Sequence, residues 1–112
     1  MSDISMPKPT RVHAEKRHTL APWPDDAFNA FSKAVFAPGA LDARTKQLIA
    51  VAVAHVTQCP WCFKGHVKAA RREGATGAAI IEAIWVTAEM RAGAAFAHSI
   101  KALDLIDDHT AP

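Results

Sequence analysis

Residues 43–57 constrain the fold of this chain most, because this segment is apolar on nearly all sides. Its central stretch, Leu48 to Ala54, contains no polar side chain. Asp42 before it is a good helix N-cap, and Pro60 after it cannot lie inside a helix. The segment is therefore predicted to be a helix that lies centrally in the fold or is covered by another subunit.

The rest of the chain is also predicted to be helical. Alanine, the strongest helix former, supplies 24 of the 112 residues. Apolar side chains recur at helical spacing from Pro24 to Pro38, and further helices are predicted over 60–73, over 77–91 and, after a break or close contact at Gly93, to about residue 107. No hairpin-bounded strand pattern is present, so we predict an all-α domain of about five helices.

Residues 1–22 are predicted to be an N-terminal arm, because prolines punctuate them and their charges are mostly basic. The arm is interpreted as a solvated terminus or as a segment that packs on a neighbouring subunit. Residues 23–112 then form the helical domain. So much apolar helix in a short chain predicts self-association into a homo-oligomer.

The charge pattern narrows the functional classes. A net charge of +2, with both signs spread along the chain, argues against dedicated nucleic-acid binding. No uncharged apolar run is long enough to span a membrane, and the first residues do not resemble a secretory signal. A cytoplasmic location is expected. In a reducing compartment, two cysteines are more typical of catalysis, redox activity or metal binding than of a structural crosslink.

Both cysteines lie in one short stretch, residues 58–66, which also contains a histidine. Pro60 is predicted at the first helical position, which makes Cys59 the N-cap and places Cys62 in the first turn. The helix dipole favours a thiolate there, and thiols in such positions titrate at about 3.5–7.5. His66 lies four residues after Cys62, on the same helix face, where it can take the thiol proton.

Two further side chains are candidates for this site. The helices over 43–57 and 60–73 are joined by a very short turn and are predicted to be antiparallel. Counting outward from the turn, Gln47 lies nearly level with His66 and can orient its ring through a hydrogen bond, although it cannot accept its proton. His55, four residues before Cys59, is a second candidate partner for the thiols.

The residues alone leave three interpretations open. The pair can be a catalytic dithiol with a nucleophile, a resolving thiol and a base. It can instead be part of a metal-binding or redox-sensing module without turnover, since Cys59, Cys62 and His66 are ligand types that zinc prefers. A helical assembly protein with unreactive cysteines is the third.

The pattern resembles the carboxymuconolactone decarboxylase-like superfamily, and within it the alkylhydroperoxidase D-like branch. The resemblance runs from about Leu41 to Asp107 and includes residues 41–50, the stretch from His55 to Cys62, His66, residues 74–76 and Glu82-Ala83. The signature of the branch is a glutamate, eleven residues, and then Cys-x-x-Cys-x-x-x-His.

The resemblance implies a helical subunit that assembles into trimers or hexamers and reduces hydroperoxides through a disulfide cycle. Cys62 would be the peroxidatic thiolate, Cys59 the resolving cysteine and His66 part of the proton relay. An external dithiol would be the reductant, and no cofactor or metal is expected. This chain departs from the signature at Gln47, where the branch has glutamate. Lactone decarboxylation is not expected, because the decarboxylases generally lack the cysteine pair.

Overall fold

The computed structural model describes residues 7–108, which form five α-helices and no β-strand. The predicted all-α class is thereby confirmed. The chain divides into two compact units, residues 1–43 and 44–112. No helix within residues 7–108 is both long enough and apolar enough to cross a membrane. The predicted division into an arm and a domain at residues 22 and 23 stays a prediction.

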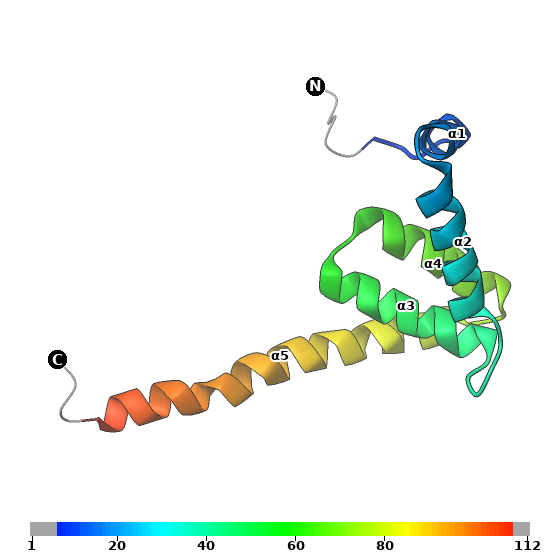
Figure 1. The fold of residues 1–112 in the computed structure, drawn as a ribbon. Coiled ribbons are helices and arrows are strands. Elements are labelled where there is room, and N and C mark those ends of the chain that lie inside the picture. Colours follow the sequence, from blue (N-terminus) through cyan, green and yellow to red (C-terminus); the bar gives the residue numbers. More distant parts are fainter. Residues whose placement is uncertain (1–6, 109–112) are drawn as a thin grey trace. The chain divides into compact units, whose positions relative to one another are not determined.

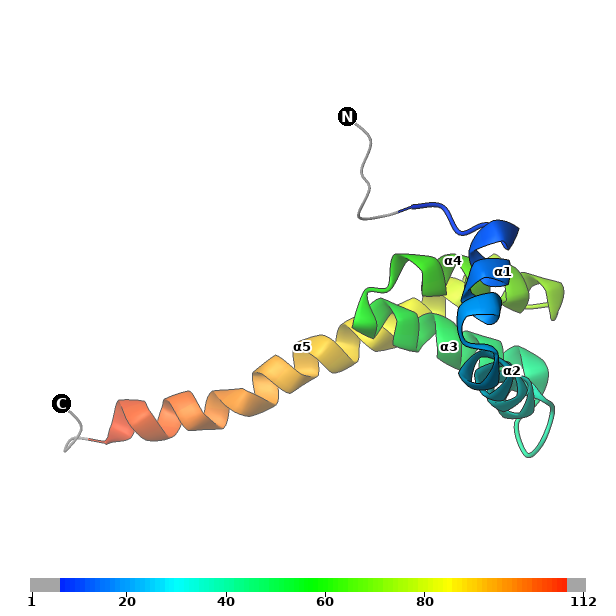
Figure 2. The ribbon, with the colours of Figure 1, turned by 45° about the horizontal axis from the view of Figure 1, so that its top comes forward.

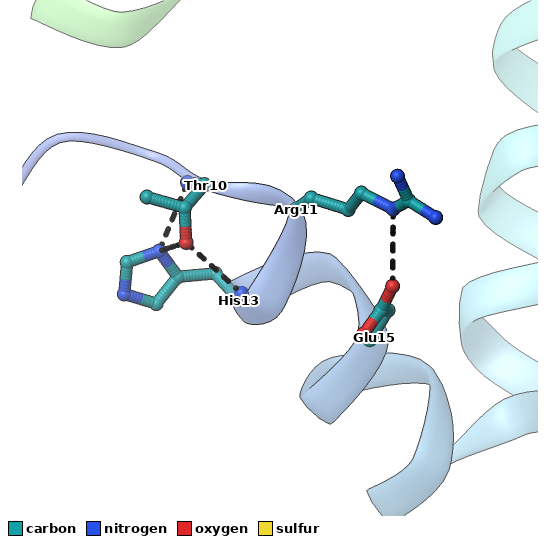
Figure 3. A network of polar contacts seen from close by, with 4 residues as sticks. All are labelled: Thr10, Arg11, His13 and Glu15. Carbon is teal, nitrogen blue, oxygen red and sulfur yellow. Dashed lines mark hydrogen bonds and ion pairs between the residues drawn. The ribbon is translucent and has the colours of Figure 1, made fainter.

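The first unit holds a helix that the sequence did not predict. Helix α1 spans Arg11–Leu20. The Thr10 hydroxyl accepts a hydrogen bond from the His13 N–H at 3.3 Å, and the Thr10 N–H donates to His13 Nδ1 at 3.0 Å. This is a capping box in which histidine replaces the usual Glu or Gln. Figure 3 shows it beside the ion pair between Arg11 and Glu15, 3.2 Å apart.

Helix α2 spans Pro22–Phe36, so it begins two residues before the predicted start. Both Pro22 and Pro24 fit in its first turn. Backbone N–H groups in the first turn of an α-helix have no intrahelical partner, so a proline there breaks no hydrogen bond. His18 Nε2 lies 2.9 Å from Asp26 Oδ1, which joins α1 to α2.

The second unit is a hairpin of two helices packed on a third. Helix α3 spans Ala43–Thr57, α4 spans Pro60–Arg72 and α5 spans Gly77–Asp107. Figures 1 and 2 both show α3 and α4 beside the first half of α5, whose second half extends past them. The fully buried Val51 and Ala70 meet Ala75 and Ile80 in the core, and Leu48, Val67 and Ile84 pack around it.

The end of α4 is fixed by a Schellman motif. The Gly74 N–H donates to the Arg71 carbonyl at 3.0 Å, and the Ala75 N–H donates to the Ala70 carbonyl at 2.9 Å. Gly74 has a φ of +89°, in the left-handed region that favours glycine. The predicted stop at Gly74 is confirmed, as is the Thr76 cap of α5, whose hydroxyl accepts from the Ala79 N–H at 3.0 Å.

The predicted break at Gly93 is wrong, because α5 runs without interruption from Gly77 to Asp107. A glycine inside a helix costs about 1 kcal/mol relative to alanine, but it keeps its N–H and breaks no hydrogen bond. Alanine-rich turns on both sides of Gly93 supply the missing propensity. Among residues 7–108, the side chain of Glu89 on the same helix is what lies within 4 Å of a Cβ built at Gly93, so no other described helix approaches this position.

Candidate active site

The turn that carries the first cysteine is very tight. Gln58 adopts a left-handed conformation with a φ of +56°, and the Cys59 N–H donates back to the Ala54 carbonyl at 3.3 Å. Because Pro60 begins α4, Cys59 ends the turn and is also the N-cap of the next helix. The predicted cap is confirmed. Two residues therefore reverse the chain and deliver both cysteines to the start of α4.

Cys59 and Cys62 are joined by a disulfide, with their Cα atoms 5.2 Å apart. The Cys62 N–H donates to Cys59 Sγ at 3.3 Å, so a free backbone donor at the helix start already faces sulfur. The first turn of α4 contains no acidic residue that would oppose a negative charge there. Cys59 is half-buried and Cys62 is exposed, so the second cysteine is the more accessible to a reactant.

His66 is held by the residue predicted to orient it. Its Nδ1 lies 2.7 Å from Gln47 Oε1, and both side chains are half-buried between α3 and α4. An amide oxygen can only accept a hydrogen bond, so Nδ1 carries the ring proton and Nε2 is the nitrogen able to take another. The predicted hydrogen bond between Gln47 and His66 is confirmed, and their catalytic roles remain a matter for proposal.

His55 is engaged differently from His66. Its Nδ1 lies 2.7 Å from the Val51 carbonyl oxygen of the same helix, and its ring centroid lies 5.6 Å from that of Phe63. Within residues 7–108, the contacts found for His55 do not include either cysteine. The structure therefore brings His66 and Gln47 together but does not join His55 to the sulfurs. The role of His55 in the site stays a prediction.

Two side chains of α5 that the sequence did not single out hold the end of α3. The buried Thr87 hydroxyl donates to the Ala52 carbonyl at 2.9 Å, and Arg91 Nη1 donates to the Val56 carbonyl at 3.0 Å. Arg91 thus supplies a donor to a carbonyl near the C-terminus of α3, where a positive charge is favourable. The spacing of four residues, which places Thr87 and Arg91 on one face of α5, was the available signal.

The cysteines do not form a metal cluster in this geometry. Among residues 7–108, the one group of three ligand atoms that lie mutually within 4.8 Å comprises His18, Asp25 and Asp26. These three residues lie in the first unit and are largely exposed, as surface carboxylates commonly are. The zinc interpretation of Cys59, Cys62 and His66 therefore gains no support.

The family model for the carboxymuconolactone decarboxylase family matches residues 25–105. The chain belongs to this family. The matched segment contains α3, α4 and all but the last two residues of α5, including every candidate site residue described above. The resemblance seen in the sequence is confirmed at the level of the family.

The chain is similar to several known proteins. Uncharacterized protein 4 in cox locus of Paracoccus denitrificans is 68% identical over 108 residues, which cover 96% of each chain. The solved structure of a carboxymuconolactone decarboxylase family protein from Legionella pneumophila has a TM-score of 0.69 and 29% identity, covering 83% of each chain. A family member from Thermotoga maritima has a TM-score of 0.55 and 24% identity, covering 72% of this chain and 93% of the other.

Proposed function

We propose that the protein is a thiol-dependent peroxidase that cycles the Cys59–Cys62 pair between dithiol and disulfide. The observation that carries the proposal is the position of the pair. Both cysteines lie at the start of α4, and Cys62 is one turn before His66, whose Nδ1 is held by Gln47. The helix dipole and the histidine act in the same direction, since both favour the thiolate over the thiol.

In the first step, His66 Nε2 takes the proton of the Cys62 thiol, and the thiolate attacks one oxygen of a hydroperoxide. The S–O bond forms as the O–O bond breaks, and the departing alkoxide takes the proton back from the imidazolium. The products are a sulfenic acid on Cys62 and an alcohol, or water when the substrate is hydrogen peroxide.

In the second step, the Cys59 thiol attacks the Cys62 sulfenic acid, which releases water and forms the disulfide. An external dithiol then reduces this disulfide by exchange through a mixed disulfide and is itself oxidised. The separation of 5.2 Å between the two Cα atoms lets the disulfide close without unfolding the helix start.

Gln47 limits what the proton relay can do. It fixes the tautomer of His66 but cannot remove a proton from the ring. The balanced first step needs no terminal acceptor, because the proton taken from Cys62 returns to the leaving alkoxide. Gln47 is therefore compatible with turnover, with His66 as a shuttle within one site.

Two observations outside the site support the proposal. The Thermotoga maritima family member has been suggested to act in an antioxidative response. Large apolar side chains such as Trp85, Val86 and Met90 on α5 are 69%, 61% and 63% exposed, which favours assembly of several copies. We place the homo-oligomer, a trimer or hexamer, in the cytoplasm, where a dithiol reductant is available.

Serine variants of the two cysteines test the assignment of roles. Cys62→Ser is expected to abolish consumption of an organic hydroperoxide, because it removes the nucleophile. Cys59→Ser is expected to react once and then accumulate sulfenic or sulfinic acid, which mass spectrometry detects as added oxygen. Normal steady-state turnover in Cys62→Ser would contradict the assignment. If the disulfide forms with hydroperoxide but no dithiol reduces it again, the redox-sensing alternative would be favoured.

A further inference from the structure

Cys59 lies between two helix ends of opposite polarity. Its N–H donates to the Ala54 carbonyl at 3.3 Å and closes the last turn of α3, and Gln58 before it has the left-handed φ of a Schellman motif. Cys59 is also the N-cap of α4. The negative end of the α3 dipole and the positive end of the α4 dipole therefore meet at this residue. Helix α4 favours a thiolate on Cys59, whereas α3 opposes it.

A cation from α5 contacts the same end of α3. Arg91 Nη1 donates a hydrogen bond to the Val56 carbonyl at 3.0 Å. A Schellman motif here engages the carbonyls of residues 54 and 55, so the Val56 carbonyl is one of those that need a donor from outside the helix. Val56 and Cys59 are three residues apart, and that length of chain spans at most about 11 Å even when extended. The guanidinium is therefore anchored at the helix end that Cys59 closes.

A second contact fixes the register of α5 against α3. Thr87, one turn before Arg91 on the same face of α5, is buried, and its hydroxyl donates to the Ala52 carbonyl at 2.9 Å. Ala52 is in turn four residues before Val56, so both contacts advance by one turn along each helix. The two helices run side by side in the same direction here, as Figures 1 and 2 also show. A contact made by a buried side chain thus places Arg91 level with the end of α3.

No carboxylate of the hairpin neutralises this charge. Residues 43–72, which comprise α3 and α4, contain no Asp or Glu. The carboxylate nearest to Arg91 along α5 is Glu89, whose Oε1 is directed toward Gly93, and neither of the ion pairs found among residues 7–108 involves Arg91. The other titratable groups within one or two turns of the cysteine pair are His55 on α3 and Lys64 and His66 on α4.

We infer that the fixed charge of Arg91 offsets the negative end of α3 and thereby activates Cys59 as the resolving thiolate. The inference rests on the proposed function and assigns a positioning residue to its second step, in addition to the role of His66 in the first. In that step the Cys59 thiolate attacks the sulfur of the Cys62 sulfenic acid. The S–S bond forms as the S–O bond breaks, and the hydroxide that leaves is protonated to water. A larger thiolate fraction on Cys59 shortens the lifetime of the sulfenic acid and so limits its further oxidation.

The test measures how fast iodoacetamide alkylates Cys59 in the full chain carrying Cys62→Ser, in which Cys59 is the one remaining thiol. Arg91→Gln keeps an N–H donor for the Val56 carbonyl but removes the charge, whereas Arg91→Lys keeps the charge. The matched control, Thr87→Val, removes the other hydrogen bond between α5 and α3 without changing any charge. Each rate is measured at about pH 6 and again at alkaline pH, where the thiol is fully ionised.

We expect Arg91→Gln to react about threefold more slowly at pH 6 and low ionic strength, because a unit charge acting over about 10 Å changes the thiolate fraction more than it changes the nucleophilicity. The rate at alkaline pH should not fall, since the charge alters how much thiolate forms and not the access to it. Arg91→Lys should keep most of the rate at pH 6, and Thr87→Val should keep all of it. The difference should vanish near 1 M salt, where the screening length is about 3 Å.

An unchanged rate in Arg91→Gln at pH 6 would overturn the inference. A loss at both pH values, or an equal loss in Thr87→Val, would also overturn it, because either result would show that Arg91 only supports the turn. Since iodoacetamide takes the place of the peroxide, this outcome is independent of the proposed reaction. A failure here with intact peroxide chemistry removes only the role of Arg91. Failure of disulfide formation with hydroperoxide removes the proposed function itself.

Discussion

At the level of single residues, the proposed mechanism depends on the hydrogen bond that the Gln47 amide offers to His66. The level of Gln47 with His66 followed from counting residues on both sides of the turn, and the structure confirms their contact at 2.7 Å. The left-handed Gln58 could not be predicted, because nothing in its side chain requires a φ of +56°. His55 had the right distance in sequence from Cys59, but a carbonyl of its own helix holds its Nδ1.

Gln47→Glu tests the relay directly. A carboxylate beside Nδ1 favours the imidazolium, and the imidazolium stabilises the Cys62 thiolate. We expect the reduced variant to react with iodoacetamide at pH 6 about tenfold faster than the unmodified protein, equivalent to about 1.4 kcal/mol. Gln47→Leu, the control without a polar group, should react more slowly than both. An unchanged rate in Gln47→Glu would show that His66 is not coupled to the thiol.

At the level of helices, the sequence predicted the boundaries best where one residue acts directly on the backbone. Pro60, Gly74 and Thr76 each act within a few residues, and each ends or begins a helix where expected. Helix α1 was missed because His13 takes the place that Glu or Gln usually has in a capping box. The break at Gly93 was wrong because a weak local preference was given more weight than the alanines around it.

Alanine substitutions at two glycines test why α4 ends at Gly74 and why α5 continues through Gly93. Gly93→Ala should raise the free energy of unfolding by about 0.4–1 kcal/mol, because the added Cβ meets only Glu89 Oε1 at 3.5 Å. Gly74→Ala should lower it by more than about 1 kcal/mol, because its φ of +89° is unfavourable for alanine. Urea unfolding at fixed protein concentration measures both. A loss of stability in Gly93→Ala would indicate close packing of another subunit at this position.

At the level of the whole molecule, the predicted self-association would explain both the small core and the exposed apolar surface. The buried side chains are few and mostly small, whereas many large apolar side chains on α3 and α5 remain exposed. The sequence predicted this imbalance, because residues 48–54 leave α3 no polar face. It could not predict which helix faces meet in an assembly, since nearly every face is apolar enough to do so.

A charge placed on α5 tests the predicted assembly. Trp85→Glu should shift the protein to smaller species in sedimentation velocity, because a carboxylate in an apolar interface is costly to desolvate. The far-ultraviolet circular dichroism should keep its helical form, since the Trp85 side chain is 69% exposed within one chain. Lys101→Ala serves as a control that should not change the sedimentation. Identical sedimentation of Trp85→Glu and the unmodified protein would place the interface elsewhere.

The central claim is that the start of α4 and His66 activate the cysteine pair toward peroxides. Its most direct test is the rate at which fully reduced protein forms the Cys59–Cys62 disulfide with one equivalent of an organic hydroperoxide. Mass spectrometry follows the loss of two hydrogens, and dithiothreitol serves as the reference dithiol. We expect a rate at least about tenfold above the reference, within the contribution expected of acid–base catalysis, and we expect this rate to be lost in Cys62→Ser. A rate no higher than that of dithiothreitol would contradict the central claim.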